Sequence, residues 1–290
     1  MVDSTAKFRE SLDGDGIVVA PGAYDAASAK LVEQAGAEVV YMSGSSVSTS
    51  VHGHPDVGLT TLTEMTDRAR RMANAVGVPV FADADTGYGN PINVRRTITE
   101  FEAAGVAGVH LEDQVFPKRC GHFEGKDVVP TREMVAKLRA AADAREDDDF
   151  VLIARTDARA VEGFEAAVDR SRAYVEAGAD VVFFEAPESA DELAAAAERI
   201  DAPMLANMTE GGKTPMLTAD ELEGLGFDIV LFPATGFKAV LRTLQDVYAA
   251  IVETGSQQDV MDRLVSWEGR NEVTGLDEIA TWEERYAVDD

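Results

Sequence analysis

Two acidic residues, Asp83 and Asp85, stand two positions apart at the end of a short apolar run. At positions i and i+2 of one strand their side chains leave the same face, so both can point at one ion. Glu112 ends another apolar run and can add a third oxygen, directly or through water. A set of oxygen ligands with room for water suits Mg2+, or alternatively Mn2+, rather than zinc. The competing interpretation is a turn with a helix cap, which explains Asp85 but not Asp83.

The lone cysteine of the chain, Cys120, is a second candidate for chemistry. Lys118 and Arg119 precede it and His122 follows, and such basic neighbours favour a thiolate that can act as an acid or base. The loop that carries Cys120 runs to about Thr131, which is long enough to close over a substrate as a lid. An incidental thiol on a surface loop is the alternative interpretation.

Other apolar runs also end in polar side chains. These segments are Tyr41-Met42-Ser43-Gly44-Ser45, Glu112-Asp113-Gln114, Arg155-Thr156-Asp157, Glu185 and Asn207-Met208-Thr209-Glu210. The carboxyl ends of barrel strands open onto the active-site face, where packing alone does not require a polar group at nearly every end. The pattern therefore predicts an enzyme. His110 lies within a strand and is expected to be a hydrogen-bonded core residue.

The elements that position these residues follow a repeating pattern. Ala-rich amphipathic stretches precede short apolar runs, and each stretch ends in a glycine: Gly36, Gly105, Gly178 and Gly226. Eight apolar runs are predicted as strands, at residues 17–20, 38–41, 78–81, 106–111, 150–154, 180–184, 202–205 and 228–232. Strands that alternate with helices indicate a parallel sheet with right-handed crossovers. Eight such units predict an α/β fold, a closed (β/α)8 barrel of TIM type.

Two further helical stretches follow the eighth strand, at about 236–255 and 257–268, with a tail that ends at Tyr286. A closed barrel needs one helix fewer, so the extra helix is expected to pack on another subunit or to act as a lid. No linker rich in Pro, Gly or Ser divides the chain. The prediction is a single barrel domain over residues 1–290, with 236–290 as a C-terminal helical extension.

The composition narrows the class of protein. The 290 residues include 53 Asp plus Glu against 26 Lys plus Arg, a formal net charge of -27, so binding to nucleic acid or to an anionic membrane is not expected. The 46% of hydrophobic residues argue against disorder. One cysteine forms no internal disulfide, and the sequence shows no signal peptide or membrane span, so we expect a soluble cytoplasmic protein. Lysine is scarce among the cations, which is typical of high-salt cytoplasms and predicts a halophilic protein.

Five segments together resemble the isocitrate lyase/phosphoenolpyruvate mutase superfamily. They are 83–89, Glu112-Asp113-Gln114, Lys118-Arg119-Cys120-Gly121-His122, Ala154-Arg155-Thr156-Asp157-Ala158 and Asn207-Met208-Thr209-Glu210. The resemblance covers about residues 8–285 and looks closest to the 2-methylisocitrate lyase branch. It implies a Mg2+-dependent lyase that cleaves 2-methylisocitrate to pyruvate and succinate in propionate metabolism. It also implies a homotetramer whose last helix is swapped between subunits.

The resemblance also assigns roles to individual residues. Asp83 and Asp85 match metal ligands, and Asp56 and Glu112 match the water-mediated shell of the metal. Cys120 matches the catalytic acid, and the other catalytic candidates are Tyr41, Lys118 and His122. The substrate-binding candidates are Ser43, Gly44, Ser45, Gly121, Arg155, Glu185, Asn207, Thr209, Lys238 and Arg270.

The sequence departs from this branch at two positions. Ser45 stands where many methylisocitrate lyases have glycine, and Lys238 stands where a second carboxylate-binding arginine is usual. A lysine cannot make the same bidentate contact. A dimethylmalate lyase, an isocitrate lyase or an oxaloacetate hydrolase of the same superfamily is therefore the alternative. A phosphonomutase or a non-catalytic binding barrel is less favoured. The expected partner is a small di- or tricarboxylate.

Overall fold

The computed structural model describes residues 4–119 and 125–288. The chain divides into two compact units, Met1–Phe237 and Lys238–Asp290. The strands lie in the first unit.

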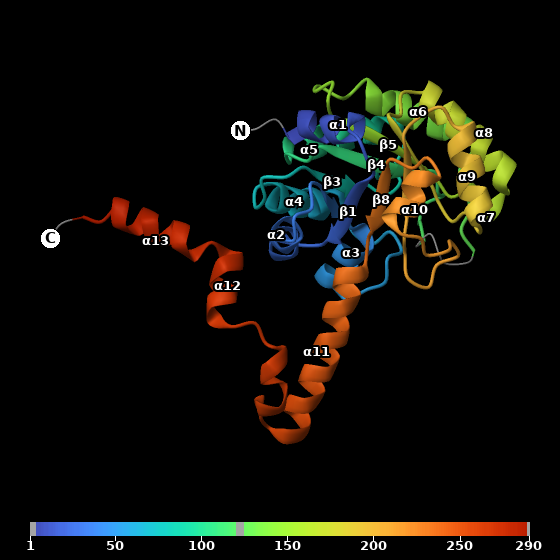
Figure 1. Cartoon of the computed structure of the whole chain (residues 1–290). Helices are drawn as coiled ribbons and strands as arrows, with labels where there is room; N and C mark the ends of the chain where they lie inside the picture. The colour runs from blue at the N-terminus through green and yellow to red at the C-terminus, as the bar shows by residue number, and fades with distance from the viewer. Residues whose placement is uncertain (1–3, 120–124, 289–290) are drawn as a thin grey trace. The chain divides into compact units, whose positions relative to one another are not determined.

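Eight parallel strands of the first unit form a closed ring in chain order, in which β1 pairs with both β2 and β8 (Figure 1). They are β1 (Val18–Ala23), β2 (Val40–Met42), β3 (Val80–Asp83), β4 (Gly108–Glu112), β5 (Val151–Thr156), β6 (Val181–Phe184), β7 (Met204–Asn207) and β8 (Ile229–Phe232). The predicted (β/α)8 barrel is confirmed.

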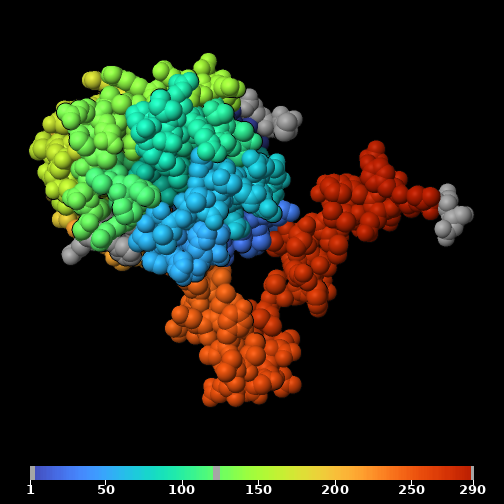
Figure 2. Space-filling view, turned by 180° about the vertical axis from the view of Figure 1, so that it is seen from behind, coloured from blue at the N-terminus to red at the C-terminus, as the bar shows by residue number. Residues whose placement is uncertain are grey.

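Helices alternate with the strands and cover the outside of the barrel (Figure 1). They are α1 (Ser4–Asp13), α2 (Ala26–Gln34), α3 (Gly44–His52), α4 (Leu62–Ala73), α5 (Pro91–Ala103), α6 (Thr131–Ala142), α7 (Ala158–Val161), α8 (Phe164–Glu176), α9 (Ala190–Arg199) and α10 (Ala219–Gly224). Seen from behind, the side chains of this unit form a continuous surface (Figure 2). Four predicted C-terminal glycines have φ between 84° and 106°, the left-handed conformation that ends a helix: Gly36, Gly105, Gly178 and Gly226.

The apolar core has one layer inside the ring and another between the ring and the helices. Phe81 of β3 faces inward and stacks on Phe8 of α1, with ring centroids 5.1 Å apart. The next residue, Ala82, faces outward and packs with Met72 and Phe101 of the surrounding helices. Successive residues of a strand alternate between the two layers. Burial on both faces explains why the strands read as nearly unbroken apolar runs.

The ends of the strands differ from the prediction by up to three residues. β3 begins after Pro79 and β7 begins after Pro203, because proline lacks the N–H group that a ladder position requires. Asp83, Glu112 and Asn207 are the last residues of their strands. Their side chains are therefore held by the ladder itself rather than by the following loops.

The second unit is helical. α11 (Thr235–Thr254) continues into it from the first unit, and a 3-10 helix η1 (Gln258–Arg263), α12 (Trp267–Thr274) and α13 (Leu276–Arg285) follow. The predicted helix at 257–268 is wrong. A new helix starts after Ser266, whose hydroxyl accepts a hydrogen bond from the Gly269 N–H, and Gly275 at φ 73° separates α12 from α13.

α11 carries a face of large apolar side chains at three- and four-residue spacing, and these side chains are exposed: Val240, Leu241, Leu244, Tyr248, Ile251 and Val252. Packing of this extension on another subunit, the swapped helix and the tetramer stay predictions. Among residues 4–119 and 125–288, none of the helices combines the length and the apolar character that a bilayer span requires.

Candidate active site

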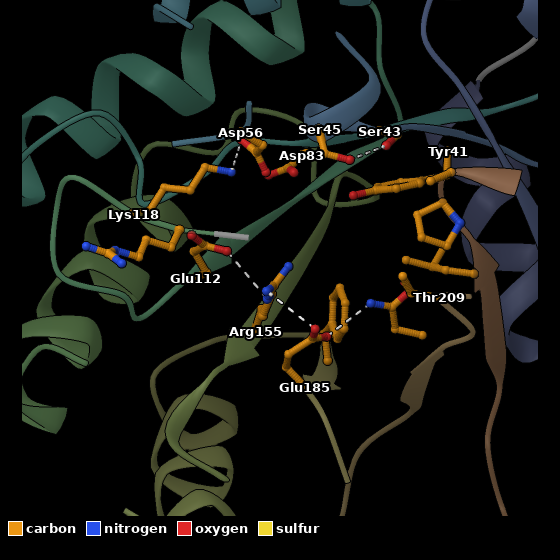
Figure 3. A pocket seen from close by; sticks show the side chains of 16 residues that line it. Tyr41, Ser43, Ser45, Asp56, Asp83, Glu112, Lys118, Arg155, Glu185 and Thr209 are labelled. Atoms are coloured by element: carbon orange, nitrogen blue, oxygen red, sulfur yellow. Dashed lines mark hydrogen bonds and ion pairs between the residues drawn. The ribbon is translucent and has the colours of Figure 1, made fainter. Parts of the chain in front are cut away.

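A cavity lies at the carboxyl ends of the barrel strands (Figure 3). Most of the residues that line it are polar, and the full set is Tyr41, Ser43, Ser45, Asp56, Asp83, Glu112, Lys118, Arg119, Arg155, Phe183, Glu185, Asn207, Thr209, Leu231, Pro233 and Ala234. Polar side chains that the sequence places at separate strand ends thus converge on one cavity.

Lys118 lies among the carboxylates at one side of this cavity. Its Nζ is 2.6 Å from Asp56 Oδ1 and 2.6 Å from Asp85 Oδ1, and Figure 3 shows the first of these contacts. Asp83 Oδ1 accepts a hydrogen bond from the Asp85 backbone N–H at 2.9 Å and lies 3.6 Å from His110 Nε2. Asp85 has φ 47°, a left-handed conformation that is uncommon outside glycine. β3 ends at Asp83, so the prediction that Asp83 and Asp85 extend from one strand is wrong: Asp85 lies in the turn that follows it.

The electrostatics of these groups reflect their burial. Burial raises the pKa of Asp83, raises that of Asp85 to about 7, and raises that of Glu112 well above its usual value. Burial alone would lower the pKa of Lys118, but Asp85, Glu112 and Asp56 raise it well above its usual value. Lys118 is therefore an ammonium ion at neutral pH. Its single positive charge does not balance the three carboxyl groups of Asp85, Glu112 and Asp56 that surround it.

The donor set of these residues fits a magnesium ion. Asp56 Oδ1 and Asp85 Oδ1 lie within about 5 Å of each other because both contact one nitrogen at 2.6 Å. An Mg2+–oxygen bond is roughly 2.1 Å long and a bound water extends the reach of the ion, so two oxygens at this separation can serve one ion, one directly and the other through water. Glu112 Oε1 is buried and has no hydrogen-bond partner among the described residues. The part of the chain that the structure describes holds no ready-made group of three or more His, Cys, Asp or Glu around one point.

Arg155 of β5 is fixed in the middle of the cavity by acidic neighbours. Its Nε and one terminal nitrogen donate to the two oxygens of Asp157, at 2.9 and 3.2 Å. Ion pairs reach Glu112 at 3.4 Å and Glu185 at 3.7 Å, and the guanidinium lies over the Phe183 ring at 5.0 Å (Figure 3). A guanidinium held in this way presents its remaining N–H groups in a fixed direction, as bidentate recognition of a carboxylate requires.

Asp157 connects Arg155 to the loop that follows β4. Its Oδ1 also accepts a hydrogen bond from Lys126 Nζ at 2.6 Å. Its backbone N–H donates to Asp113 Oδ1 at 2.9 Å, and Asp113 Oδ2 accepts from the Tyr174 hydroxyl at 2.7 Å. Burial would raise the pKa of Asp157, but Arg155 and Lys126 lower it below its usual value. Asp157 is therefore a permanent carboxylate shared by two cations.

A chain of polar contacts completes the wall beyond Arg155. Asn207 Nδ2 donates to Glu185 Oε2 at 3.1 Å, and Thr209 Oγ1 donates to Asn207 Oδ1 at 3.0 Å. Because each side chain is held by the next, all three are oriented without a ligand. Figure 3 shows Glu185 and Thr209 apart from Asp56 and Asp83, with Arg155 between the two groups.

Tyr41 and His110 form a buried pair at the base of the cavity. The Tyr41 hydroxyl lies 2.8 Å from His110 Nε2. Burial lowers the pKa of His110 well below its usual value and raises that of Tyr41 well above its usual value, so both are neutral at neutral pH. His110 is a hydrogen-bonded core residue, as the sequence predicts.

The N-terminus of α3 forms another part of the wall. Ser43 caps the helix by accepting a hydrogen bond from the Ser46 N–H, and Ser45 Oγ lies 3.5 Å from Ser43 Oγ. The first N–H groups of a helix have no partner within it, and together with the helix dipole they favour an anion. Ser43 and Ser45 both line the cavity, so a substrate oxygen can meet these groups there.

Gly44 leaves space that Asp83 fills. A Cβ added at Gly44 would collide with the carboxyl group and the Cβ of Asp83. We therefore expect Gly44→Ala to push Asp83 aside and to lower kcat/KM by about 10²-fold, the cost of a misplacement of about 1 Å at a reacting centre. The matched control is Gly224→Ala, where an added Cβ meets nothing within 4 Å. Unchanged kcat/KM and Mn2+ affinity in Gly44→Ala would show that this contact does not position Asp83.

Five predicted site residues lie outside the described residues or in the second unit. Cys120, Gly121 and His122 lie outside the described residues. Lys238 and Arg270 belong to the second unit, where Arg270 lies over the Trp267 ring at 5.1 Å. The roles of all five stay predictions.

Two residues of the site have no role of their own in the sequence predictions. Asp157 appears there only as part of a polar strand end, and it lies just beyond β5, at the start of α7. Lys126 carried no local signal, because its partner Asp157 lies 31 residues further along the chain.

Comparison with known proteins gives the family. Residues 8–252 match the phosphoenolpyruvate phosphomutase family. The chain is 46% identical over 287 residues to a 2,3-dimethylmalate lyase of Eubacterium barkeri, covering 99% of both chains. It is 48% identical over 257 residues to a 2-methylisocitrate lyase of Aeropyrum pernix, covering 89% of this chain and 82% of the relative.

Solved structures agree with these relatives. A 2,3-dimethylmalate lyase described as a PEP mutase/isocitrate lyase superfamily member superposes with a TM-score of 0.93 at 37% identity, covering 100% of both chains. A phosphonopyruvate hydrolase in complex with oxalate and Mg2+ superposes with a TM-score of 0.89 at 30% identity, covering 98% of this chain and 99% of the other. The chain therefore belongs to the phosphoenolpyruvate mutase/isocitrate lyase superfamily and is a carbon–carbon lyase of that superfamily.

Proposed function

We propose that the protein cleaves 2-methylisocitrate to pyruvate and succinate, with Mg2+ (or Mn2+) as its cofactor. One observation carries the proposal. The cavity combines a fixed guanidinium at Arg155 with four nearby carboxylates whose oxygens fit a divalent cation: Asp56, Asp83, Asp85 and Glu112. A 2-hydroxy acid needs a cation at its hydroxyl and a donor at its carboxylates. The relative from Aeropyrum pernix supports the choice of substrate.

The residues divide the work of binding. Asp83 and Asp85 would hold the metal directly, and Asp56 and Glu112 would hold it through water. When bound, Mg2+ acts as a Lewis acid that lowers the pKa of the substrate hydroxyl. Arg155 binds a substrate carboxylate. The hydroxyls and N–H groups at Ser43, Gly44 and Ser45 bind the part of the substrate that becomes pyruvate, and Glu185, Asn207 and Thr209 contact the rest.

The reaction is a retro-Claisen cleavage. A base removes the hydroxyl proton, the hydroxyl carbon becomes the carbonyl of pyruvate, and the electrons of the broken carbon–carbon bond pass to the succinate part. Cys120 then donates a proton to that carbon. Of the two candidate bases, a carboxylate such as Glu112 is favoured over Tyr41, because burial raises the pKa of Tyr41 too far for a phenolate near neutral pH.

A second candidate substrate is 2,3-dimethylmalate, which would give pyruvate and propionate. It is favoured by the Eubacterium barkeri relative, which matches this chain over its whole length. Lys238 in place of an arginine points the same way, because a dicarboxylate needs one carboxylate contact fewer than a tricarboxylate.

The assay that distinguishes these substrates incubates the purified protein and Mg2+ with 2-methylisocitrate, 2,3-dimethylmalate or oxaloacetate, one at a time. Pyruvate is followed with lactate dehydrogenase, and the second product is identified by NMR. We expect pyruvate and succinate from 2-methylisocitrate. Pyruvate and propionate from 2,3-dimethylmalate alone would establish the second candidate. Oxalate and acetate from oxaloacetate, without turnover of the other two, would reject both.

Metal binding should depend on pH. Burial raises the pKa of Asp85 to about 7, so this carboxyl group is partly protonated at neutral pH, whereas a metal requires the carboxylate. Mn2+ affinity is therefore expected to rise as the pH increases through about 7, with protons released on binding. Titration calorimetry in buffers of different ionisation enthalpy measures both quantities. An affinity that is constant from about pH 6 to 8 would contradict the assignment of Asp85.

The exposed apolar face of α11 supports a further part of the proposal, a homotetramer in which the C-terminal helix packs on a neighbouring subunit. The net charge of -27 supports a high-salt cytoplasm as the place of action. Both parts are independent of the choice of substrate.

A further inference from the structure

We infer that Lys118 is a built-in counter-ion of the carboxylate site, and that a divalent metal ion must displace its ammonium group from Asp56 and Asp85 in order to bind. The inference rests on the metal site of the proposed function and adds that the Lys118 ammonium group competes with the metal ion for that site.

The contacts of Lys118 carry the inference. Its Nζ contacts one oxygen of Asp56 and one of Asp85, each at 2.6 Å, with the side chain 2% exposed. Both carboxylates belong to the proposed metal set. A metal ion that Asp85 would bind directly, at about 2.1 Å, and that Asp56 would bind through water needs the same two oxygens that the ammonium group now contacts. One pair of oxygens cannot serve both cations, so metal and ammonium exclude each other.

The surrounding loop fixes the backbone next to Lys118. The side-chain amide of Gln114 accepts a hydrogen bond from the Arg119 N–H at 2.9 Å and donates one to the Arg119 carbonyl at 2.9 Å. The same stretch of chain is tied to the far end of the loop by the Val115 N–H, which donates to the Asp127 carbonyl at 2.8 Å. Lys118 is therefore directed at the carboxylates by the fold.

Lys126 provides a contrast within the same loop. It is also a buried lysine paired with a carboxylate at 2.6 Å, but its partner is Asp157, which holds Arg155 and is not in the proposed metal set. Metal loading should release Lys118 and leave Lys126 in place. Lys118 then becomes a cation beside the cavity and is available to an anionic substrate.

The first test measures metal affinity without substrate. Free Mn2+ is followed by electron paramagnetic resonance in wild type, Lys118→Gln and Lys137→Gln. Lys137 is a buried lysine that also interacts electrostatically with Glu112, but its Nζ donates to the Thr86 carbonyl. Its replacement therefore removes one positive charge near the site without removing a direct contact to Asp56 or Asp85. We expect Lys118→Gln to bind Mn2+ at least about tenfold more tightly than wild type, and Lys137→Gln to change affinity much less.

Each other outcome overturns the inference. Equal or weaker binding by Lys118→Gln shows that the ammonium does not compete. An equal gain in Lys137→Gln shows only an effect of local charge. Absence of Mn2+ binding in all three proteins rejects the proposed metal site itself. This outcome differs from Mn2+ binding that is not improved in Lys118→Gln, which rejects only the competition by Lys118.

A second measurement needs no variant. Wild-type protein is acetylated with acetic anhydride in EDTA and in Mn2+, and the lysines are mapped by mass spectrometry. We expect acetylation of Lys118 to increase severalfold in Mn2+, while Lys126 stays protected in both conditions. Protection of Lys118 in saturating Mn2+ would show that it is not displaced.

Discussion

Asp85→Asn is expected to lower kcat/KM by about 10³-fold or more while the metal-free protein becomes no less stable at about pH 8. The loss of activity follows from the loss of a ligand to a Lewis acid that contributes several kcal/mol, and each 1.36 kcal/mol is about tenfold in rate. Asparagine tolerates the left-handed φ of 47° at this position, so the backbone is retained.

The stability half of this prediction follows from the raised pKa. A carboxyl group with a pKa of about 7 in the fold and about 3.9 unfolded is most favourable below pH 4, and this contribution is lost as the pH rises through 7. At about pH 8 the charged Asp85 therefore costs the metal-free fold roughly a few kcal/mol, which the neutral amide avoids. Thermal unfolding in EDTA at about pH 5 and 8 measures the difference.

The matched control is Asp67→Asn, which removes an exposed carboxylate paired with Arg71 on α4. Its activity and Mn2+ affinity should equal those of wild type. Asp85→Asn with wild-type Mn2+ affinity would remove Asp85 from the metal set.

Cys120→Ser is expected to lower cleavage by roughly 10²–10⁴-fold, the range that general acid catalysis contributes, because a serine hydroxyl is a far weaker acid than a thiol. The two described residues that precede it support this role. Arg119, the preceding residue, lines the cavity, and Lys118 contacts Asp56 and Asp85.

The control for this variant is metal binding. Cys120 is not a proposed ligand, so Mn2+ affinity and the unfolding temperature should match those of wild type, which separates a lost acid from a lost fold. Because the chain has one cysteine, titration of thiols verifies the replacement directly. Wild-type turnover in Cys120→Ser would assign protonation to another group.

The barrel was predictable because its local signals are strong. Gly36 and its three equivalents end helices at positive φ, and the apolar runs after them are buried on both faces of the ring. Strand ends were less predictable, since the ladder starts after Pro79 and Pro203 for a reason of hydrogen bonding rather than of hydropathy. The predicted helix at 257–268 is in fact η1 followed by the start of α12. This break was missed because it depends on a single capping residue, Ser266.

The site was predictable as a collection of residue types, but not as a geometry. Asp83, Glu112 and Arg155 could be assigned to one mouth because parallel strands end at one rim. No spacing along the chain shows that Lys118 reaches Asp56, since that contact crosses 62 positions. The sequence marks Lys118 as a cation near the site, and only the fold shows which anions it meets.

The shared carboxylate of Asp157 makes two distant parts of the barrel mouth energetically dependent on each other. Arg155 and Lys126 draw on the same oxygen, so the free energy of either contact depends on the state of the other. A ligand that withdraws Arg155 from Asp157 leaves that oxygen to Lys126 alone, and by reciprocity any change at Lys126 alters the affinity of Arg155 for its ligand. Ligand binding at Arg155 and the contact of the loop residue Lys126 are thus linked equilibria, because both depend on the Asp157 carboxylate.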